Sequence, residues 1–134
     1  IRAGLADGTI DLISSDHTPV GADDKLRPFE EAAPGATGLE TLLPLTLKWA
    51  RETKTPLVRA LAKVTSEAAR VLGEDTGRIA VGAKADLVIF DEAEPWRVTP
   101  ESLISAGKNT PYAGYELEGR ARTTIVGGEV RFGG

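Results

Sequence analysis

The sequence predicts an α/β fold in which a barrel-type part precedes a small sheet. Residues 10–15 form an apolar run that stops at Asp16, which is typical of a barrel strand that carries polar groups at its C-terminal end. Residues 39–52 repeat apolar side chains at helical spacing. Short β-type runs dominate the end of the chain, so we expect the barrel-type part at residues 1–76 and the sheet at residues 77–134.

The composition argues against several kinds of site and partner. The 134-residue chain has no cysteine, which excludes disulfides and thiolate metal sites. Its formal net charge of -4 argues against nucleic acid or an anionic membrane as a partner, because both need clustered Lys and Arg. Apolar runs reach about five residues, whereas a membrane-spanning helix needs about 20. We therefore expect a cytoplasmic protein with no nucleic-acid or membrane partner.

The first part divides into a strand, a long loop and a helix. Residues 10–15 read as a buried strand, and the Pro-, Gly- and Asp-rich residues 18–38 read as a functional loop. An apolar stripe predicts a helix over residues 39–52, and Pro44 predicts a kink or a later start. The residues of this stripe are Leu39, Leu42, Leu43, Leu47 and Ala50.

Two shorter helices are expected to follow. Pro56 is suited to open a helix over residues 56–64. Ser66 is a candidate cap for a helix over residues 67–72, and Gly73 is suited to close it.

The last part of the chain reads as β-structure. Residues 95–115 form an irregular excursion whose aromatic side chains, Trp96, Tyr112 and Tyr115, are expected to cover the sheet. Gly127-Gly128 supplies a two-residue hairpin turn. The expected strands are residues 78–80, 85–91, 119–126 and 129–132.

Four segments give the chain a family resemblance. They are Ser-Asp-His-Thr-Pro at residues 15–19, Pro-Gly-Ala-Thr-Gly-Leu-Glu-Thr at 34–41, Gly-Arg-Ile-Ala-Val-Gly-Ala-Lys-Ala-Asp-Leu-Val-Ile-Phe-Asp at 77–91, and Asn-Thr-Pro-Tyr-Ala-Gly-Tyr-Glu-Leu-Glu-Gly at 109–119. Together they resemble the C-terminal portion of class I dihydroorotases, which are members of the amidohydrolase superfamily. The third segment is shared across the superfamily, whereas the second and fourth point more narrowly to hydrolases of cyclic amides.

The resemblance implies the C-terminal piece of a metal-dependent (β/α)8 TIM barrel together with part of a small β-sandwich. Residues 10–16 would be the eighth barrel strand, residues 39–72 the closing helices and residues 77–132 the sandwich part. The chain contains no methionine and begins in mid-pattern with Ile1, so we expect it to be the C-terminal part of a longer polypeptide.

The resemblance also implies a zinc hydrolase that opens and closes dihydroorotate and N-carbamoyl-aspartate, in pyrimidine biosynthesis. One or two Zn²⁺ ions would be bound, and Asp16 would be both a metal ligand and the catalytic group that moves a proton. The remaining ligands, mostly histidines and a carboxylated lysine, would lie upstream of Ile1. The 134-residue chain alone is therefore not expected to be active.

Three further positions take roles from the same resemblance. His17, the only histidine, would support the site without binding metal. The backbone groups of Pro34 and Gly35 would meet the pyrimidine ring of the substrate. Taken alone, the residues favour simpler interpretations: Asp16 would cap the turn that follows it, and Pro34-Gly35 would be an ordinary turn.

One position departs from the family pattern. Class I dihydroorotases usually carry a histidine, which helps to bind the substrate carboxylate, where this chain has Val20. Losing such a charge-assisted contact costs about 1.5–3 kcal/mol. A polar group from the rest of the barrel, or Lys25 or Arg27 turning inward, would have to replace the missing contact in an active dihydroorotase.

Val20 therefore leaves three functions open. The first is an active dihydroorotase that binds a small-molecule substrate and forms a homo-oligomer. The second is a non-catalytic dihydroorotase-like subunit that supports aspartate transcarbamoylase. The third is a hydantoinase- or dihydropyrimidinase-like enzyme that acts on an uncharged cyclic amide.

Overall fold

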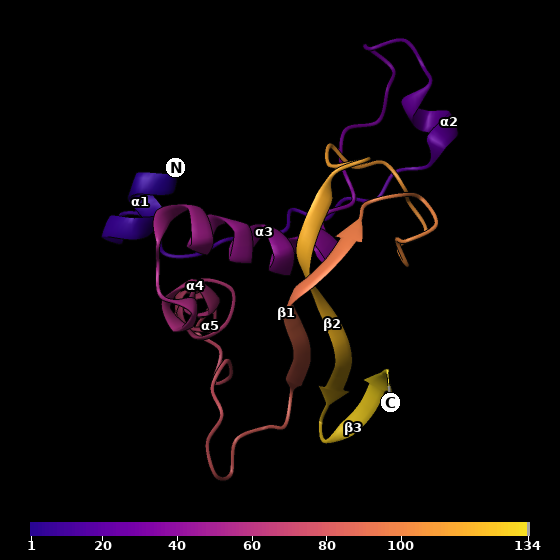
Figure 1. The fold of residues 1–134 in the computed structure, drawn as a ribbon. Helices are drawn as coiled ribbons and strands as arrows, with labels where there is room; N and C mark the ends of the chain where they lie inside the picture. Colours follow the sequence, from indigo (N-terminus) through magenta and orange to yellow (C-terminus); the bar gives the residue numbers. More distant parts are fainter. Residues whose placement is uncertain (134) are drawn as a thin grey trace.

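The computed structural model describes residues 1–133 and shows a group of helices beside a three-stranded sheet (Figure 1). The helices in this part of the chain are α1 (Arg2–Asp7), α2 (Ala22–Lys25), α3 (Leu39–Thr53), α4 (Leu57–Ala62) and α5 (Ser66–Leu72). The strands are β1 (Leu87–Arg97), β2 (Glu116–Val126) and β3 (Glu129–Phe132). Over residues 1–133, no helix combines the length and the apolar character that crossing a bilayer requires.

The predicted helices over residues 39–52, 56–64 and 67–72 are confirmed as α3, α4 and α5. α3 starts at Leu39, as predicted. Pro44 lies inside the helix, which therefore tolerates the loss of one backbone donor. Thr65, and not Ser66, is the residue that precedes α5, and Gly73 closes it in the left-handed conformation, with φ of 72°. The short helices α1 and α2 were not predicted, because a few residues carry too little periodicity.

Two predicted strands are wrong. Residues 10–16 form no β-ladder, because Ile13 N–H donates to Lys63 O (3.1 Å) and no strand of the described chain lies beside them. Residues 78–80 lie in the irregular segment that extends away from the other elements between α5 and β1 (Figure 1). Both segments have the composition of a strand, but neither has a neighbouring strand to pair with among the described residues.

The sheet has the order β1-β2-β3, and every neighbouring pair is antiparallel. The predicted hairpin turn is confirmed: Gly127 and Gly128 have φ of 59° and 85°, the values that a two-residue turn needs. β1 continues further than predicted. Trp96 therefore lies in β1, where it pairs with Leu117 of β2, and does not belong to the irregular excursion. The described residues contain this one sheet, and a sandwich remains a proposal.

Two apolar clusters form the core. The first joins α1, α3 and α4 through Leu5, Trp49 and Ala60. The second packs the residues that follow β1 against β2, through Val98, Leu103 and Leu117, with Tyr112 beside them. α3 crosses β2 between the two clusters and so connects the helices to the sheet (Figure 1).

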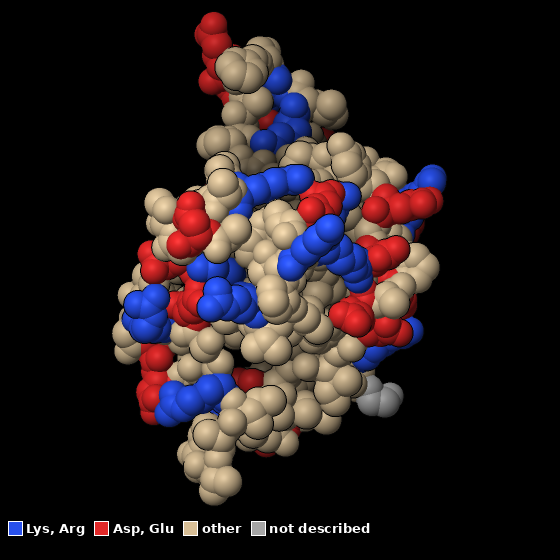
Figure 2. Space-filling view, turned by 60° about the vertical axis from the view of Figure 1, so that its left-hand side comes forward, with Lys and Arg blue, Asp and Glu red and all other residues tan. Residues whose placement is uncertain are grey.

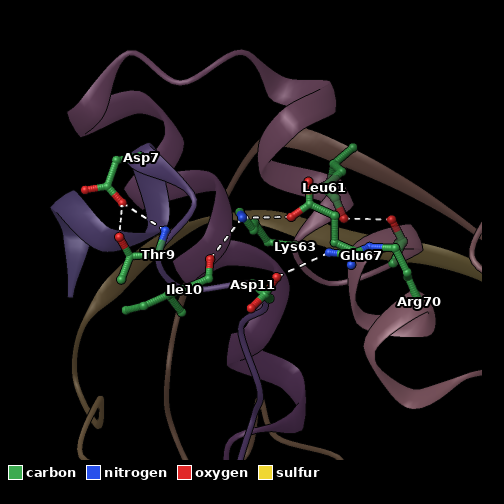
Figure 3. A network of polar contacts seen from close by, with 9 residues as sticks. Asp7, Thr9, Ile10, Asp11, Leu61, Lys63, Glu67 and Arg70 are labelled. Atoms are coloured by element: carbon green, nitrogen blue, oxygen red, sulfur yellow. Dashed lines mark hydrogen bonds and ion pairs between the residues drawn. The ribbon is translucent and has the colours of Figure 1, made fainter.

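A polar network joins Ile10 and Asp11 to Lys63, which follows α4, and to α5 (Figure 3). The Lys63 ammonium donates to Ile10 O (3.0 Å) and pairs with Glu67 (2.7 Å). Arg70 of α5 pairs with Asp11 (3.2 Å). These contacts fix the start of the segment that leads to Asp16.

The charged side chains are mixed on the face that Figure 2 shows, with Lys and Arg beside Asp and Glu. Several of them form ion pairs, such as Arg51 with Glu118 (2.7 Å) between α3 and β2. Exposed pairs of this kind add at most about 1 kcal/mol each, so the two core clusters remain the main support of the fold.

Candidate active site

Asp16 lies on the lining of a cavity of about 540 Å³. Its backbone is left-handed, with φ of 45°, and its N–H donates to Ser14 Oγ (3.3 Å). No N–H of the following turn bonds to the carboxylate, since the N–H of Thr18 donates to Ala36 O (2.9 Å). The Asp16 side chain is exposed, and its carboxylate is free of protein donors over residues 1–133. Asp is one of the few residues besides glycine that adopt the left-handed conformation readily.

The rest of the cavity lining comes from separate parts of the chain. Residues 35–38 and one face of α3 supply most of it, and Pro111 and Tyr112 close one side. Trp49 of α3 contributes a ring that is 7% exposed and whose Nε1–H has no partner within the described residues. The wall is mainly apolar, with backbone amides at residues 35–38, as a pocket for a small molecule requires.

His17 bonds to the start of α3 and does not face another candidate metal ligand. Its Nδ1 accepts hydrogen bonds from the N–H groups of Gly38 (3.2 Å) and Leu39 (3.3 Å). As an acceptor, Nδ1 thus serves two of the backbone donors that open a helix. A parallel bridge between His17 and Ala36 adds to the same connection.

Residues 34–38, termed the Gly35 loop from here on, lie against the end of the Asp16 segment. Gly35 has φ of 123°, and a Cβ atom there would lie 2.5 Å from Thr18 O, so only glycine fits. Gly35 belongs to the cavity lining, whereas Pro34 is exposed and does not. The structure thus brings Gly35, but not Pro34, to the cavity with Asp16.

Thr37 and Asn109 were missed as site residues. Thr37 is 1% exposed, and its N–H donates to Asn109 O (2.6 Å). Asn109 in turn donates from Nδ2 to Gly35 O (3.1 Å). The only sequence signal was that these residues stand in two of the segments that carry the family resemblance.

Val20 is buried and lies outside the cavity lining. The two basic residues considered as substitutes for a carboxylate anchor are engaged elsewhere: Lys25 donates to Ala33 O (2.6 Å), and Arg27 pairs with Asp24 (3.3 Å). Neither is therefore placed to bind a carboxylate in the cavity. The basic residue that does line the cavity is Arg2, which pairs with Glu52 (2.6 Å).

Asp16 is the candidate metal ligand at this cavity. Over residues 1–133, no group of three or more His, Cys, Asp or Glu side chains is arranged to hold a metal ion. A catalytic zinc takes about three protein ligands and a water. The free carboxylate of Asp16 at the cavity fits the role of one such ligand, so this chain would supply part of a centre and not all of it.

Comparison with known proteins identifies the relatives of the chain. A profile of the amidohydrolase family matches residues 1–132. A dihydroorotase of Geobacter sp. (strain M21) is 42% identical over 130 residues, which are 97% of this chain and 31% of that protein. A dihydroorotase of Trichlorobacter lovleyi is 42% identical over 134 residues, which are 100% of this chain and 32% of that protein. The chain thus spans about a third of the length of these curated relatives.

Solved structures share the fold. The D-hydantoinase (dihydropyrimidinase) from Thermus sp. has a TM-score of 0.88 at 25% identity, over 98% of this chain and 30% of that one. The L-hydantoinase (dihydropyrimidinase) from Arthrobacter aurescens has a TM-score of 0.86 at 30% identity, over 98% of this chain and 31% of that one. The arrangement of helices and sheet is therefore one that occurs as part of these larger hydantoinases.

Proposed function

The chain belongs to the amidohydrolase family, and on this basis we propose that the full-length protein is a dihydroorotase. It would catalyse the zinc-dependent, reversible hydrolysis of dihydroorotate to N-carbamoyl-aspartate in the cytoplasm, as a step of pyrimidine biosynthesis. The position of Asp16 carries the proposal, because a free carboxylate lines a cavity beside the Gly35 loop. The dihydroorotases that match almost the whole chain support the choice of substrate.

Asp16 would hold one zinc ion together with ligands from the rest of the protein. When bound, zinc lowers the pKa of water to near neutrality and so supplies hydroxide at physiological pH. The Asp16 carboxylate accepts the proton of the attacking nucleophile and delivers it to the ring nitrogen as the amide bond breaks. This delivery is needed because an unprotonated amide nitrogen is a poor leaving group. In the direction of ring closure, the same carboxyl first acts as the acid.

The Gly35 loop would orient the ring of the substrate. Gly35 N–H makes no hydrogen bond within the described residues, whereas Gly35 O already accepts from Asn109. The loop therefore offers a donor to a ring carbonyl, and the missing Cβ allows a close approach. Tyr112 and Trp49 would restrict water around the bound ring.

Asp16→Asn tests the catalytic role. In the full-length protein with zinc, we expect kcat with dihydroorotate to fall by about 10²–10⁴, because a positioned general base contributes that much. Asp11→Asn is the matched control, since Asp11 lies on the same segment but pairs with Arg70 outside the cavity. Equal activity of the wild type and Asp16→Asn would overturn the role of Asp16.

A hydantoinase-like activity is the second candidate, and the likeness to the two solved hydantoinases described above favours it. Its substrate has no carboxylate and so needs no basic anchor, and the basic residue of the cavity lining, Arg2, is already paired with Glu52. Parallel assays of the full-length protein with dihydroorotate, hydantoin and dihydrouracil would decide between the two enzymes. Turnover of none of them, with zinc present, would instead favour the non-catalytic subunit.

Val20→His tests where the carboxylate anchor lies. Because Val20 is buried and outside the cavity lining, an imidazole there would overfill packed space, and we expect activity with dihydroorotate to fall. The unfolding free energy of the same variant would show how much of the fall comes from lost stability. A rise in activity would mean that this side chain reaches the substrate after all.

A further inference from the structure

Three segments of the chain meet at the first turn of α3, and the Gly35 loop lies in one of them. The first segment, residues 15–18, follows the strand-like run and carries Asp16. The second is the Gly35 loop with the start of α3 itself. The third, residues 104–109, is distant in sequence and belongs to the connection between β1 and β2. Only the first two carry groups that face the substrate in the proposed function.

The third segment is bonded to the second at several points. The hydroxyl of Thr37 donates to Gly107 O, and the N–H of Thr37 donates to Asn109 O (2.6 Å). Asn109 Nδ2 donates to Gly35 O (3.1 Å). These bonds place Gly107–Asn109 directly behind the Gly35 loop.

The carboxylate of Glu40 in α3 adds a second connection. It accepts from the N–H groups of Ile104 (2.9 Å) and Ser105 (3.0 Å). A carboxylate that accepts backbone N–H groups forms a strong, directional contact. The third segment is thus held in register with the first turn of α3.

The contacts of Thr37 show how the third segment restricts the Gly35 loop. Thr37 lines the cavity, but both of its donors are turned toward Gly107 and Asn109, so neither is available to a ligand. Its side chain is almost completely buried, where an unpaired hydroxyl or carbonyl would be costly. The loop can therefore occupy only the position in which these bonds are made.

We propose that Gly107 and Asn109 position the substrate loop, and that they act through Thr37 and through the side chain of Asn109. Thr37 and Asn109 are positioning residues: they fix Gly35, whose N–H is unbonded within the described residues, at the cavity lining, and they touch no reacting atom. The inference rests on the proposed function, because it assigns these residues to the binding of the same cyclic amide.

The test compares Thr37→Val, Thr37→Ser and Asn109→Ala in the full-length protein with zinc. Valine keeps the shape of threonine but removes the hydroxyl, whereas serine keeps the hydroxyl. We expect Thr37→Val and Asn109→Ala each to raise KM about five- to tenfold with kcat changed less than about twofold, because the loop binds substrate and transition state alike. Thr37→Ser should restore KM to within about twofold of the wild type.

Lys108→Ala is the matched control. Lys108 stands between the two contact residues, and its ammonium donates to Leu103 O, just before the third segment, and not to the Gly35 loop. It should leave KM and kcat unchanged. Asn109 is exposed, so Asn109→Ala should fold even if Thr37→Val is unstable.

A second measurement does not depend on turnover. Amide hydrogen exchange of residues 35–38 should be faster in Thr37→Val and Asn109→Ala than in Lys108→Ala. If the wild type is active and both variants keep its KM, the positioning inference is wrong while the proposed function stands. If the wild type turns over no cyclic amide, the proposed function fails, and unchanged exchange at residues 35–38 would then overturn the positioning role as well.

Discussion

His17 shows how one side chain connects the candidate catalytic residue to a helix. Its Nδ1 accepts from the N–H groups of both Gly38 and Leu39, which open α3. Helix N-termini leave such donors without partners inside the helix, and a side-chain acceptor there stabilises the helix. His17 therefore keeps the neighbouring Asp16 in a fixed relation to α3.

Substitutions of His17 should show which of its two ring nitrogens stabilises the protein. His17→Ala should lower the free energy of unfolding by about 1 kcal/mol, because both backbone donors lose their acceptor. Asparagine can place an oxygen close to the position of Nδ1, whereas glutamine reaches the position of Nε2. We expect His17→Asn to recover most of the loss and His17→Gln little of it, as measured by urea unfolding. Equal loss in all three variants would mean that Nδ1 is not the group that matters.

At the scale of single residues, the sequence located part of the site. The apolar run that stops at Asp16 is a local pattern, but taken alone it favoured a turn cap, and the site role of Asp16 was predicted from the family resemblance. Thr37 and Asn109 were not, because their roles depend on contacts between positions far apart in the chain. Pro34 was placed at the substrate by resemblance, and the structure brings only its neighbour Gly35 to the cavity.

At the scale of elements, α3 is the part that carries the site. One face of α3 lines the cavity, and the opposite face contacts β2 at Gly119. A Cβ atom on Gly119 would lie 2.4 Å from Leu47 Cδ1, and Gly119 has φ of 109°. The close approach of helix and strand thus depends on this glycine.

Gly119→Ala should separate α3 from β2. We expect it to lower the free energy of unfolding by about 2–4 kcal/mol, since the positive φ and the contact with Leu47 both oppose a Cβ atom. Gly114→Ala is the control, because Gly114 also has a positive φ, of 82°, but has nothing within 4 Å of its Cβ position. The control should lose about 1–2 kcal/mol, the cost of the backbone alone. Similar losses in the two variants would contradict the packing argument.

The elements also show which patterns a sequence can reveal. The helices α3, α4 and α5 and the hairpin after Val126 were predicted, because helical spacing and a Gly-Gly turn are local signals. Residues 10–16 were wrongly predicted as a strand, because a strand exists only when a neighbour pairs with it. The backbone groups of Ile10 and Ile13 bond instead to Lys63, a contact between distant positions that no local sequence pattern predicts.

At the scale of the whole molecule, the chain leaves apolar groups uncovered. Val130 and Phe132 of β3 are 55% and 45% exposed, and they share one face because they are two residues apart on a strand. β3 is an edge strand, and its outer backbone groups have no partner in the described sheet. Beside the cavity, the Nε1–H of the buried Trp49 has no acceptor within the described residues.

These uncovered groups predict how the 134-residue chain behaves when produced by itself. Exposed apolar edges pair with other chains, so we expect association that increases with concentration, and binding of a dye that reports exposed apolar surface. Light scattering and size-exclusion chromatography over a range of concentrations would measure the association. The double variant Val130→Lys with Phe132→Lys should weaken it, because a charged edge strand resists pairing.

Ile79→Lys is the matched control for the edge strand. Ile79 is 90% exposed, but it lies in the irregular segment before β1 and belongs to no strand. It removes a comparable apolar surface without charging β3, so it should leave most of the association in place if the strand edge is the cause. If Ile79→Lys weakens association as much as the double variant does, general hydrophobicity and not the edge of β3 is responsible. A 134-residue preparation that is monodisperse and unfolds cooperatively would contradict both explanations, since these apolar groups would then be tolerated in water.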